Sequence, residues 1–598
     1  MSPSRRRFLA QAVALPAAAR ASAGDAPAAG EGAGAVVGAG PRGVLYSRIG
    51  YAPRERTRVV LRAGTREGWA DGARATLAGG ARSPRVARAG YWGDCWGAHW
   101  WVVDFGPVPA GEYALAVAGD EAGAHAVRVA EDVLWASTYP WAAADMLERR
   151  KHFTKVGAGW QDAGALWAES PAQSAMLLCL ADVVDDFGDD VGPAFAKRVY
   201  DQLVVGADYL VLCAEKAVEL GHPLGAQSHD LLGNEEYVLP NDTMKAVVAL
   251  YRAAAVLPEG DFPDRRTTYR RVAGEGLRYL REAARPLGAQ GMSLVQRGLP
   301  EDTAIPDDEW PTRDLLFLAW ACLEGWKAGV AGCEEACLAY VRRLMGRQVG
   351  ADAPEAGYHG HFREYDSLPH TEMLWSHCIV SAQELSFGAD IGAVFANYLA
   401  PVFELLERHP DHADAPAWRR CLRDYAEGFL LPATARNPFA LAPLGIFGDE
   451  GPVWFAGPFH GTNAAYGYTA AFAARLHRHW PEPRLLEVAR GNLQWVAGLN
   501  AGLTREAQAA GCVIFADDLP AGRAVPVSMV CRVGDRWAGT WFQTRGVVCN
   551  GFSVGPQFAL GPPPAADVDA PSSFTDEDWI PHSAAFLTGL MQLKRALA

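Results

Sequence analysis

Residues 159–164 read GWQDAG, and residues 170–184, a few positions later, read SPAQSAMLLCLADVV. The second stretch predicts a helix, because Ser170 is a good N-cap and Pro171 suits the first helical turn. Its large apolar residues recur with the spacing of one helical face: Met176, Leu177, Leu180, Val183 and Val184. A polar loop that carries Asp162 therefore leads into a long helix.

A segment near the other end of the chain has the same layout. Residues 576–584 read DEDWIPHSA, so carboxylates again stand beside an aromatic side chain at the start of a predicted helix, 580–597. Helical periods also occur at residues 200–220, 242–256, 264–284, 313–328, 331–347, 371–386, 391–408, 415–430, 463–478 and 484–497. So many helices of similar length, without a fixed-length repeat, predict a double-layered helical barrel over residues 138–598. A closed barrel would bring its first and last helices, and both carboxylate segments, side by side.

The preceding part of the chain alternates between apolar and polar residues as β-strands do. Residues 59–61, 100–105 and 113–117 read as short strands, and the Pro-Ala-Gly sequence at 109–111 reads as a turn before the last of them. Short strands separated by Gly and Pro predict a small β-sandwich over residues 42–132. The fold class predicted for the whole chain is mainly α.

Residues 1–23 have the features of an export signal. Residues 4–9 read SRRRFL, an apolar run follows at 10–19, and residues 21–23 read ASA, a small-residue cleavage site. This order predicts a twin-arginine signal, and the apolar run is too short to span a bilayer. Residues 24–41, rich in Ala and Gly, are expected to form a flexible leader. The mature protein is therefore expected to be periplasmic or secreted, and no later run predicts a transmembrane helix.

The composition narrows the class of protein. The chain has 598 residues, is 50% hydrophobic and carries a net charge of −14. These values favour a large core and, without a basic stripe, exclude nucleic acid as a partner. The 11 cysteines include no CxxC pair. Cys333 and Cys337 lie one helical turn apart, but no histidine completes a metal site, so we expect two buried thiols and no disulfide framework.

Several short motifs follow one another in a recognisable order. They are VLYSRIGYAP at 44–53, DFGPVPAGEY at 104–113, GWQDAG at 159–164, NPF at 437–439, HGTN at 460–463, WVAGLN at 495–500, and Glu577 followed by Ser583 and Ala584. With these motifs the chain resembles glycoside hydrolase family 9, in the form that carries an N-terminal immunoglobulin-like domain. The resemblance implies an (α/α)6 barrel preceded by a small immunoglobulin-like β-sandwich. It also implies a carbohydrate substrate and inverting hydrolysis of β-linked glucans or related β-glycosides.

The chain departs from the family pattern in two places. The family's first loop carries a second Asp, the usual catalytic base, where this chain has Ala165, and the family's His-His-Arg substrate-binding motif is missing. Residues 528–546 instead offer Arg532, Arg536, Trp537, Trp541 and Arg545. We therefore expect a substrate other than long glucan chains, either shorter or decorated.

The resemblance assigns the general acid to Glu577 and leaves Asp162 to hold the attacking water as base. An acid must be protonated at working pH, so we expect Phe574, Trp579 and Ile580 to form an apolar wall that raises the pKa of Glu577. The alternatives are an acidic first helical turn at Glu577 and a turn-stabilising role for Asp162.

Loops rich in polar and aromatic side chains are expected to contact the substrate. The substrate-binding candidates are Trp160, His361, Arg363, Tyr365, Asp366, Trp310, Arg313, His460, Trp541 and Arg545. Asp366 or Glu372 could also replace the missing base. The loop at 229–242 is similarly polar, and calcium is conceivable there although the spacing matches no calcium loop. No other cofactor or metal is expected.

Two other functions fit parts of the sequence. A polysaccharide lyase on a helical barrel would use Tyr365 or His361 as base, and Arg363 or Asn241 to neutralise a uronate. A non-catalytic carbohydrate-binding protein would account for the loss of the base at Ala165. Lyase products carry a new double bond that absorbs ultraviolet light and hydrolase products do not, so the product separates these functions.

Overall fold

The structure is a computed structural model of the chain. It describes residues 41–79, 83–154, 156–163, 168–286, 308–363, 365–367, 399–447, 451–455, 463–504, 519, 522–534, 544–553 and 573–598. For residues 447, 451, 453, 553 and 573–577 it describes the backbone alone. Residues 40–598 form one compact unit. None of the described helices is long and apolar enough to cross a membrane.

The first described strands form two antiparallel sheets that share one core. One sheet has the order β1-β2-β6-β5, with β1 (Gly43–Leu45), β2 (Arg56–Ala63), β5 (Gly90–Cys95) and β6 (Ala98–Pro107). The other has the order β4-β3-β7-β8, with β3 (Arg74–Ala78), β4 (Arg85–Arg88), β7 (Gly111–Val117) and β8 (His125–Val129). Lettered in chain order, the sheets are ABED and C′CFG, which is an immunoglobulin-like arrangement.

Alternating apolar side chains fill the space between the two sheets. Leu61 of β2 lies opposite Trp101 of β6, and both are buried in the core that the sheets share. Tyr113, near the start of β7, donates its hydroxyl hydrogen to the carbonyl of Pro109 at 2.8 Å. This tyrosine corner fixes the turn that the sequence predicts at 109–111.

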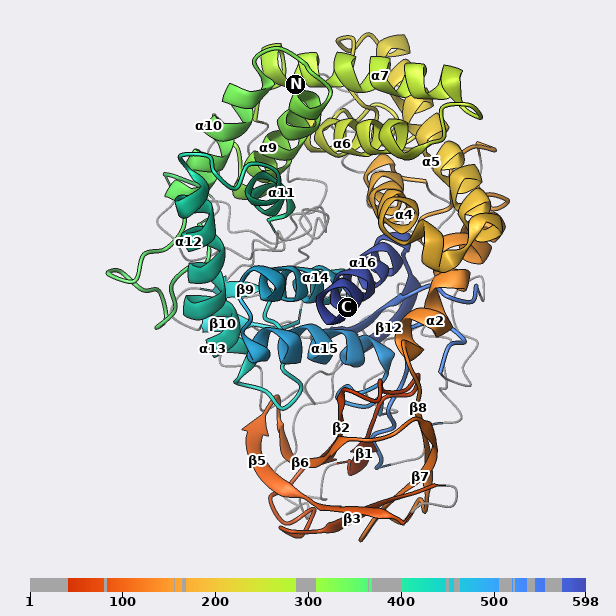
Figure 1. Cartoon of the computed structure of the whole chain (residues 1–598), viewed down its shortest axis with the longest axis vertical. Coiled ribbons are helices and arrows are strands. Elements are labelled where there is room, and N and C mark those ends of the chain that lie inside the picture. The colour runs from red at the N-terminus through yellow and green to blue at the C-terminus, as the bar shows by residue number, and fades with distance from the viewer. Residues whose placement is uncertain are drawn as a thin grey trace, which may run out of the picture. The chain divides into compact units, whose positions relative to one another are not determined.

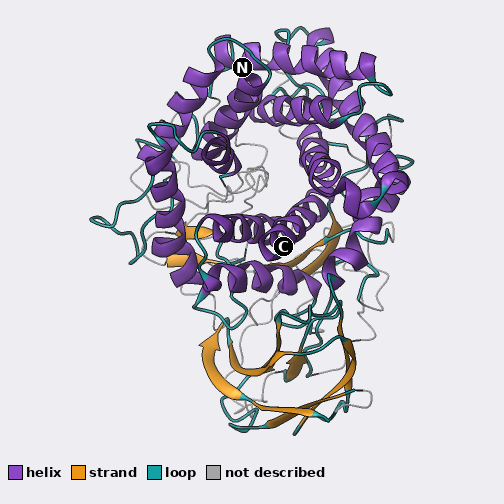
Figure 2. Ribbon diagram, viewed as in Figure 1, coloured by secondary structure: helices purple, strands orange, loops and turns teal. Residues whose placement is uncertain are grey.

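The remaining helices form an inner and an outer ring (Figure 1; Figure 2). The inner helices are α4 (Ser170–Val191), α6 (Pro240–Val256), α9 (Thr312–Lys327), α11 (Ala400–Arg408), α14 (Asn463–His479) and α16 (Ile580–Leu597). The outer helices are α5 (Pro193–Glu219), α7 (Pro263–Glu282), α10 (Cys333–Gly346), α12 (Ala415–Tyr425) and α15 (Pro483–Ala497). The outer ring also includes α2 (Val133–Pro140), η2 (Trp141–Asp145) and α3 (Met146–Arg150) before α4, and η4 (Ala426–Leu430) and α13 (Leu431–Thr434) after α12.

Burial distinguishes the two rings. Every residue of α6 from 240 to 250 is buried, because this helix has neighbours on all sides. By contrast α7 buries a single stripe that includes Tyr269, Val272 and Leu277, and its other faces meet water. The first inner helix, α4, packs against the last, α16. The predicted fold class, an (α/α)6 barrel after a small β-sandwich, is therefore confirmed.

Several predicted boundaries differ from the structure. The helix predicted at 200–220 begins earlier, at Pro193, and the helix predicted at 415–430 continues through η4 and α13 to Thr434. The helix predicted at 371–386 lies outside the described residues. Four short strands, which the sequence did not predict, lie between or before the late helices: β9 (Gly445–Phe447), β10 (Gly451–Val453), β11 (Cys549–Ser553) and β12 (Ser573–Asp578).

Candidate active site

The inner helices begin at the same end of the ring. Three hydrogen bonds join their starts: Ser170 N–H to the His229 carbonyl (2.7 Å), the Asn241 amide to Asp314 (2.6 Å), and Ala464 N–H to His582 Nδ1 (2.9 Å). These bonds connect α4 with the loop before α6, α6 with α9, and α14 with α16. The loops that precede the inner helices therefore gather at one end, as the sequence predicts for the catalytic segments.

The loop that carries Asp162 is bonded to the start of the last inner helix. The backbone N–H of Ile580 donates to the carbonyl oxygen of Asp162 at 2.9 Å. Glu577 lies three residues before Ile580, in β12, and its side chain lies outside the part that the structure describes. The two carboxylate segments are thus side by side in their backbones, as ring closure predicts.

Arg150, at the end of α3, holds these two segments together. Its Nη1 donates to the carbonyl of Gln161 at 2.9 Å, and its Nη2 forms an ion pair with Asp578. Arg150 and Asp578 both have side chains that are 0% exposed. Removing one member of a buried pair leaves the other charged and unpaired, which is strongly destabilising. Sequence reasoning missed Arg150, because an arginine at a helix end also suits the helix dipole.

The side chain of Asp162 is enclosed by the protein. It is 1% exposed, and its Oδ2 accepts a hydrogen bond from the backbone N–H of Glu169 at 2.9 Å. Burial raises the pKa of Asp162 well above its ordinary value, and the charge of Glu169 raises it further. The backbone hydrogen bond and the charges of Arg150 and His229 oppose this rise without reversing it. Asp162 therefore holds its proton more tightly than an ordinary aspartic acid.

Glu169, at the start of α4, belongs to a group of charged side chains that also includes His229 and Asp242. His229 lies between two carboxylates, with Nδ1 2.7 Å from Asp242 Oδ2 and Nε2 3.5 Å from Glu169 Oε1. Burial works against a charged imidazole, but Asp242 and Glu169 outweigh it and hold the pKa of His229 well above its ordinary value. A protonated His229 therefore faces Glu169. The side chain of Glu169 is 22% exposed, unlike that of Asp162.

The apolar wall predicted beside Glu577 is described in part. Ile580 is fully buried, and Trp579 is half-buried with its ring 5.4 Å from that of His582. The side chain of Phe574 lies outside the described residues, as that of Glu577 does. The raised pKa of Glu577 stays a prediction.

Several side chains of the segment 358–367 are buried or bonded to other residues of the protein, which limits their access to a substrate. His361 and Arg363 both contact Glu355, at 3.1 Å in each case, and Tyr365 is 1% exposed. A fully buried tyrosine offers no hydroxyl to a substrate, which argues against Tyr365 as a lyase base or a sugar contact. His361 is also buried, so of these three side chains only that of Arg363 is partly exposed.

Asp366 forms ion pairs with two arginines, Arg343 of α10 and Arg347 directly after this helix. Its carboxylate lies 2.8 Å from Arg343 Nη2 and 2.9 Å from Arg347 Nε. The hydrogen bond from Arg347 is the main reason that the pKa of Asp366 falls to about 2. So weak a base removes protons poorly at neutral pH. This corrects the expectation that Asp366 could replace the missing base, and Glu372 lies outside the described residues.

The other predicted contacts divide between core and surface. Trp160 is 0% exposed, and its Nε1 donates to Gln202 of α5 at 3.0 Å, so its ring is part of the core and cannot stack on a sugar. Arg313, at the start of α9, is buried beside Asp314, and Trp310 just before it is half-buried. Arg545 lies over the ring of Trp141 at 3.8 Å. His460 and Trp541 lie outside the described residues.

The first part of the polar loop at 229–242 is held by its own hydrogen bonds. Asp230 accepts from the backbone N–H groups of Leu232 and Asn234, each at 2.9 Å. Within the described residues no group of three or more His, Cys, Asp or Glu side chains is arranged to hold a metal ion. Cys333 and Cys337 are fully buried free thiols, as the helical spacing predicts.

The ring of helices with its preceding sandwich has the fold of a known class of glycoside hydrolases. The chain is similar to the structure of a metagenome-derived glycoside hydrolase family 9 endoglucanase, with a TM-score of 0.58 and 15% identity over 93% of this chain and 99% of that one. At this identity the likeness concerns the fold alone.

Two further solved structures match with lower scores. A cellulase of C. cellulolyticum has a TM-score of 0.39 and 11% identity, covering 74% of this chain and 88% of that one. The cellobiose 2-epimerase of Spirochaeta thermophila has a TM-score of 0.44 and 12% identity, covering 78% and 96%. No protein-family model matches the chain, and no curated protein matches it.

Proposed function

We propose that this chain is an exported glycoside hydrolase that cleaves β-linked oligo- or polysaccharides with inversion. The shared fold supports the proposal, and so does the hydrogen bond between Ile580 and the Asp162 loop. The hydrogen bond carries the argument, because cleavage of a glycosidic bond needs two carboxyl groups that flank one substrate. It keeps the segment of Glu577 beside the loop that supplies the other carboxyl group.

Glu577 is the proposed general acid. In this reaction it gives its proton to the leaving oxygen while the glycosidic bond breaks. A water molecule attacks the sugar carbon from the opposite face, and its proton passes to a carboxylate. That carboxylate must be ionised before the reaction begins.

Two carboxyl groups of the first loop can serve as this base. Asp162 holds its proton more tightly than an ordinary aspartic acid, whereas Glu169 is more exposed and faces the charged His229. We therefore assign the water-activating step to Glu169 and a positioning role to Asp162, which bonds the Glu169 backbone. Asp162 as base, the expectation from sequence, is the alternative that the variants below separate.

The test is hydrolysis by the purified mature protein. A panel of β-glucan, β-glucosaminide and uronate-containing oligosaccharides identifies the substrate class. Glu577→Gln and Glu169→Gln are each expected to lower kcat by about 10²–10⁴-fold, the usual contribution of a general acid or base. Glu427→Gln, on the exposed side of η4, is the matched control and should keep the wild-type rate.

Added azide separates the roles of the carboxyl groups. Azide should restore activity to Glu169→Gln, because it replaces the activated water, and should not restore Glu577→Gln. Rescue confined to Asp162→Asn would move the base to Asp162. A wild-type rate in Glu577→Gln would refute the assignment of the acid.

The nature of the product tests the other two functions. A lyase would release products with a new ultraviolet absorbance, which hydrolysis does not produce. Binding of oligosaccharides without any turnover would favour a non-catalytic binding protein. The absence of the family's long-chain binding motif supports a short or decorated substrate.

Export rests on the sequence of residues 1–23. We propose that the twin-arginine signal delivers the folded protein to the periplasm or beyond and is removed after residue 23. Mass spectrometry of the exported protein measures its first residue. Replacing Arg5, Arg6 and Arg7 by Lys should leave the protein in the cytoplasm, and unchanged export would refute the signal.

A further inference from the structure

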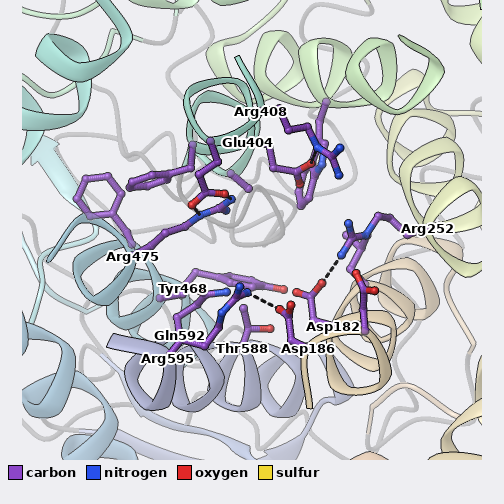
Figure 3. Close-up of a pocket in the computed structure, with 18 residues that line it drawn as sticks. Asp182, Asp186, Arg252, Glu404, Arg408, Tyr468, Arg475, Thr588, Gln592 and Arg595 are labelled. Atoms are coloured by element: carbon purple, nitrogen blue, oxygen red, sulfur yellow. Dashed lines mark hydrogen bonds and ion pairs between the residues drawn. The ribbon is translucent and has the colours of Figure 1, made fainter. Parts of the chain in front are cut away.

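A cavity of about 290 Å³ lies toward the end of the ring at which the inner helices finish (Figure 3). All six of the inner helices described contribute to its lining. Its charged residues on α4, α6, α14 and α16 come from the second halves of these helices, whereas Leu178 and Tyr468 lie in the first halves of α4 and α14. The proposed catalytic segments precede the helices. The cavity therefore extends from the middle of the ring toward the end opposite the candidate active site.

Most of the charged groups of the cavity, which are five acidic and four basic side chains, are paired with one another. Three ion pairs join neighbouring helices: Arg252 with Asp182 (2.5 Å), Arg595 with Asp186 (2.6 Å), and Arg475 with Glu407. Because each of these charges is matched, the cavity has little net charge with which to attract a phosphate or a divalent cation. The paired side chains are held in place, and their remaining oxygens and N–H groups can still form hydrogen bonds.

Two polar groups of the cavity form no hydrogen bond with a described residue, and one of them is a fully buried atom. Tyr468 of α14 is 2% exposed, and no described residue bonds its hydroxyl, which points into the cavity toward Asp182 (Figure 3). The indole N–H of Trp320, on α9, is also buried and unpaired. Buried polar groups in proteins are nearly always bonded, so the unpaired indole N–H calls for a partner, and the Tyr468 hydroxyl offers a further hydrogen bond to a molecule in the cavity.

The aromatic side chains limit the kinds of molecule that fit. Phe403 and Phe472 also line the cavity, with ring centroids 5.4 Å apart, and present apolar surface between the polar groups. A sugar ring matches this mixture, because its hydroxyls donate and accept hydrogen bonds while its C–H faces pack on aromatic rings. The volume is near the lower limit of about 300 Å³ for small-molecule sites.

We propose that this cavity is a second carbohydrate site, which binds a neutral saccharide of one or two rings. The site is separate from the proposed hydrolysis and does not require it. Its ligand would contact α4, α14 and α16, whose other ends carry the candidate active site. Binding would therefore hold the inner ring together from the end opposite the chemistry.

The test is hydrogen–deuterium exchange of the mature protein with glucose, galactose, N-acetylglucosamine and cellobiose. At least one of these sugars should slow exchange in the peptides covering 400–408 and 588–597. Tyr468→Phe removes only the hydroxyl and should weaken that binding about 3–10-fold, the loss of one hydrogen bond. Ala471→Leu fills the cavity from α14 and should abolish the protection.

Tyr466→Phe is the matched control on the same helix. Tyr466 donates to the carbonyl of Trp454 at 2.7 Å and does not line the cavity, so its loss should leave the dissociation constant unchanged. Absence of protection with all four sugars would overturn the proposal. So would equal binding by the wild type and Tyr468→Phe. Hydrolysis measured on the same preparations shows separately whether the proposed enzyme activity fails.

Discussion

The two ends of the helical ring use charge differently. At the end where the inner helices begin, Arg150 and Asp578 are fully buried and fix the backbones of two loops. At the other end, Arg595 and Asp186 are 40% and 24% exposed and link one helix to another beside a cavity. The buried pair holds the backbones of the Asp162 and Glu577 segments together, whereas the partly exposed pair joins two helices beside the proposed ligand cavity.

The largest expected effect comes from breaking the buried pair. Arg150→Met should lower the free energy of unfolding by about 3–5 kcal/mol, because Asp578 would be left buried and unpaired. The matched change at the other end, Arg595→Met, should cost no more than about 1 kcal/mol, since that pair is partly exposed. Urea denaturation of both variants measures the difference. Equal losses would refute the contrast between the two ends.

The pH dependence of stability tests the surroundings of Asp182, one of the paired carboxylates at the cavity. Burial raises the pKa of Asp182 to about 6, and Asp186 and Glu404 add to the rise against the pull of Arg252. The folded protein therefore binds this proton more tightly than the unfolded chain does. Between pH 3.8 and about 6 the unfolding free energy should fall as pH rises, by about 1–3 kcal/mol in total.

The variant Asp182→Asn isolates this group from other titrations. The difference in unfolding free energy between wild type and variant should change across pH 4–6 and be level above pH 7. A difference that stays constant over the whole range would show that the folded environment does not perturb Asp182.

A smaller effect tests the packing behind the loop that carries Asp162. A Cβ at Gly206 of α5 would lie 2.4 Å from the ring of Trp160, so Gly206→Ala should destabilise the fold by about 1–3 kcal/mol. Gly188 of α4 has nothing within 4 Å of such a Cβ. Gly188→Ala should therefore stabilise the helix by about 0.5–1 kcal/mol. Thermal unfolding compares them, and a stabilising Gly206→Ala would mean that Trp160 is not fixed in the core.

Much of the architecture could be predicted because it depends on local patterns in the sequence. Helical periodicity and Pro171 place the start of α4, and closure of a ring requires that the Asp162 loop lies beside the segment of Glu577. The turn at 109–111 was likewise predictable from its residues. These features depend on neighbours in the sequence or on one topological rule.

The site was harder to predict, because its polar partners are distant in the sequence. Nothing near Arg150 indicates that it pairs with Asp578, and nothing near Glu169 indicates His229 as its neighbour. The sequence offered Asp366 as a replacement for the missing base, but Arg343 and Arg347 bind its carboxylate. Trp160 was predicted to contact the substrate, but its indole N–H donates to Gln202 in the core. Residue type alone does not give the direction of a side chain.

The anomeric form of the first product tests the central claim most directly. Proton NMR of a β-linked oligosaccharide during hydrolysis shows which anomer appears before mutarotation mixes the two. Inversion, with Glu577 as acid and a water activated on the opposite face, predicts that the α-anomer forms first. Initial release of the β-anomer, or of an unsaturated product, would contradict the account.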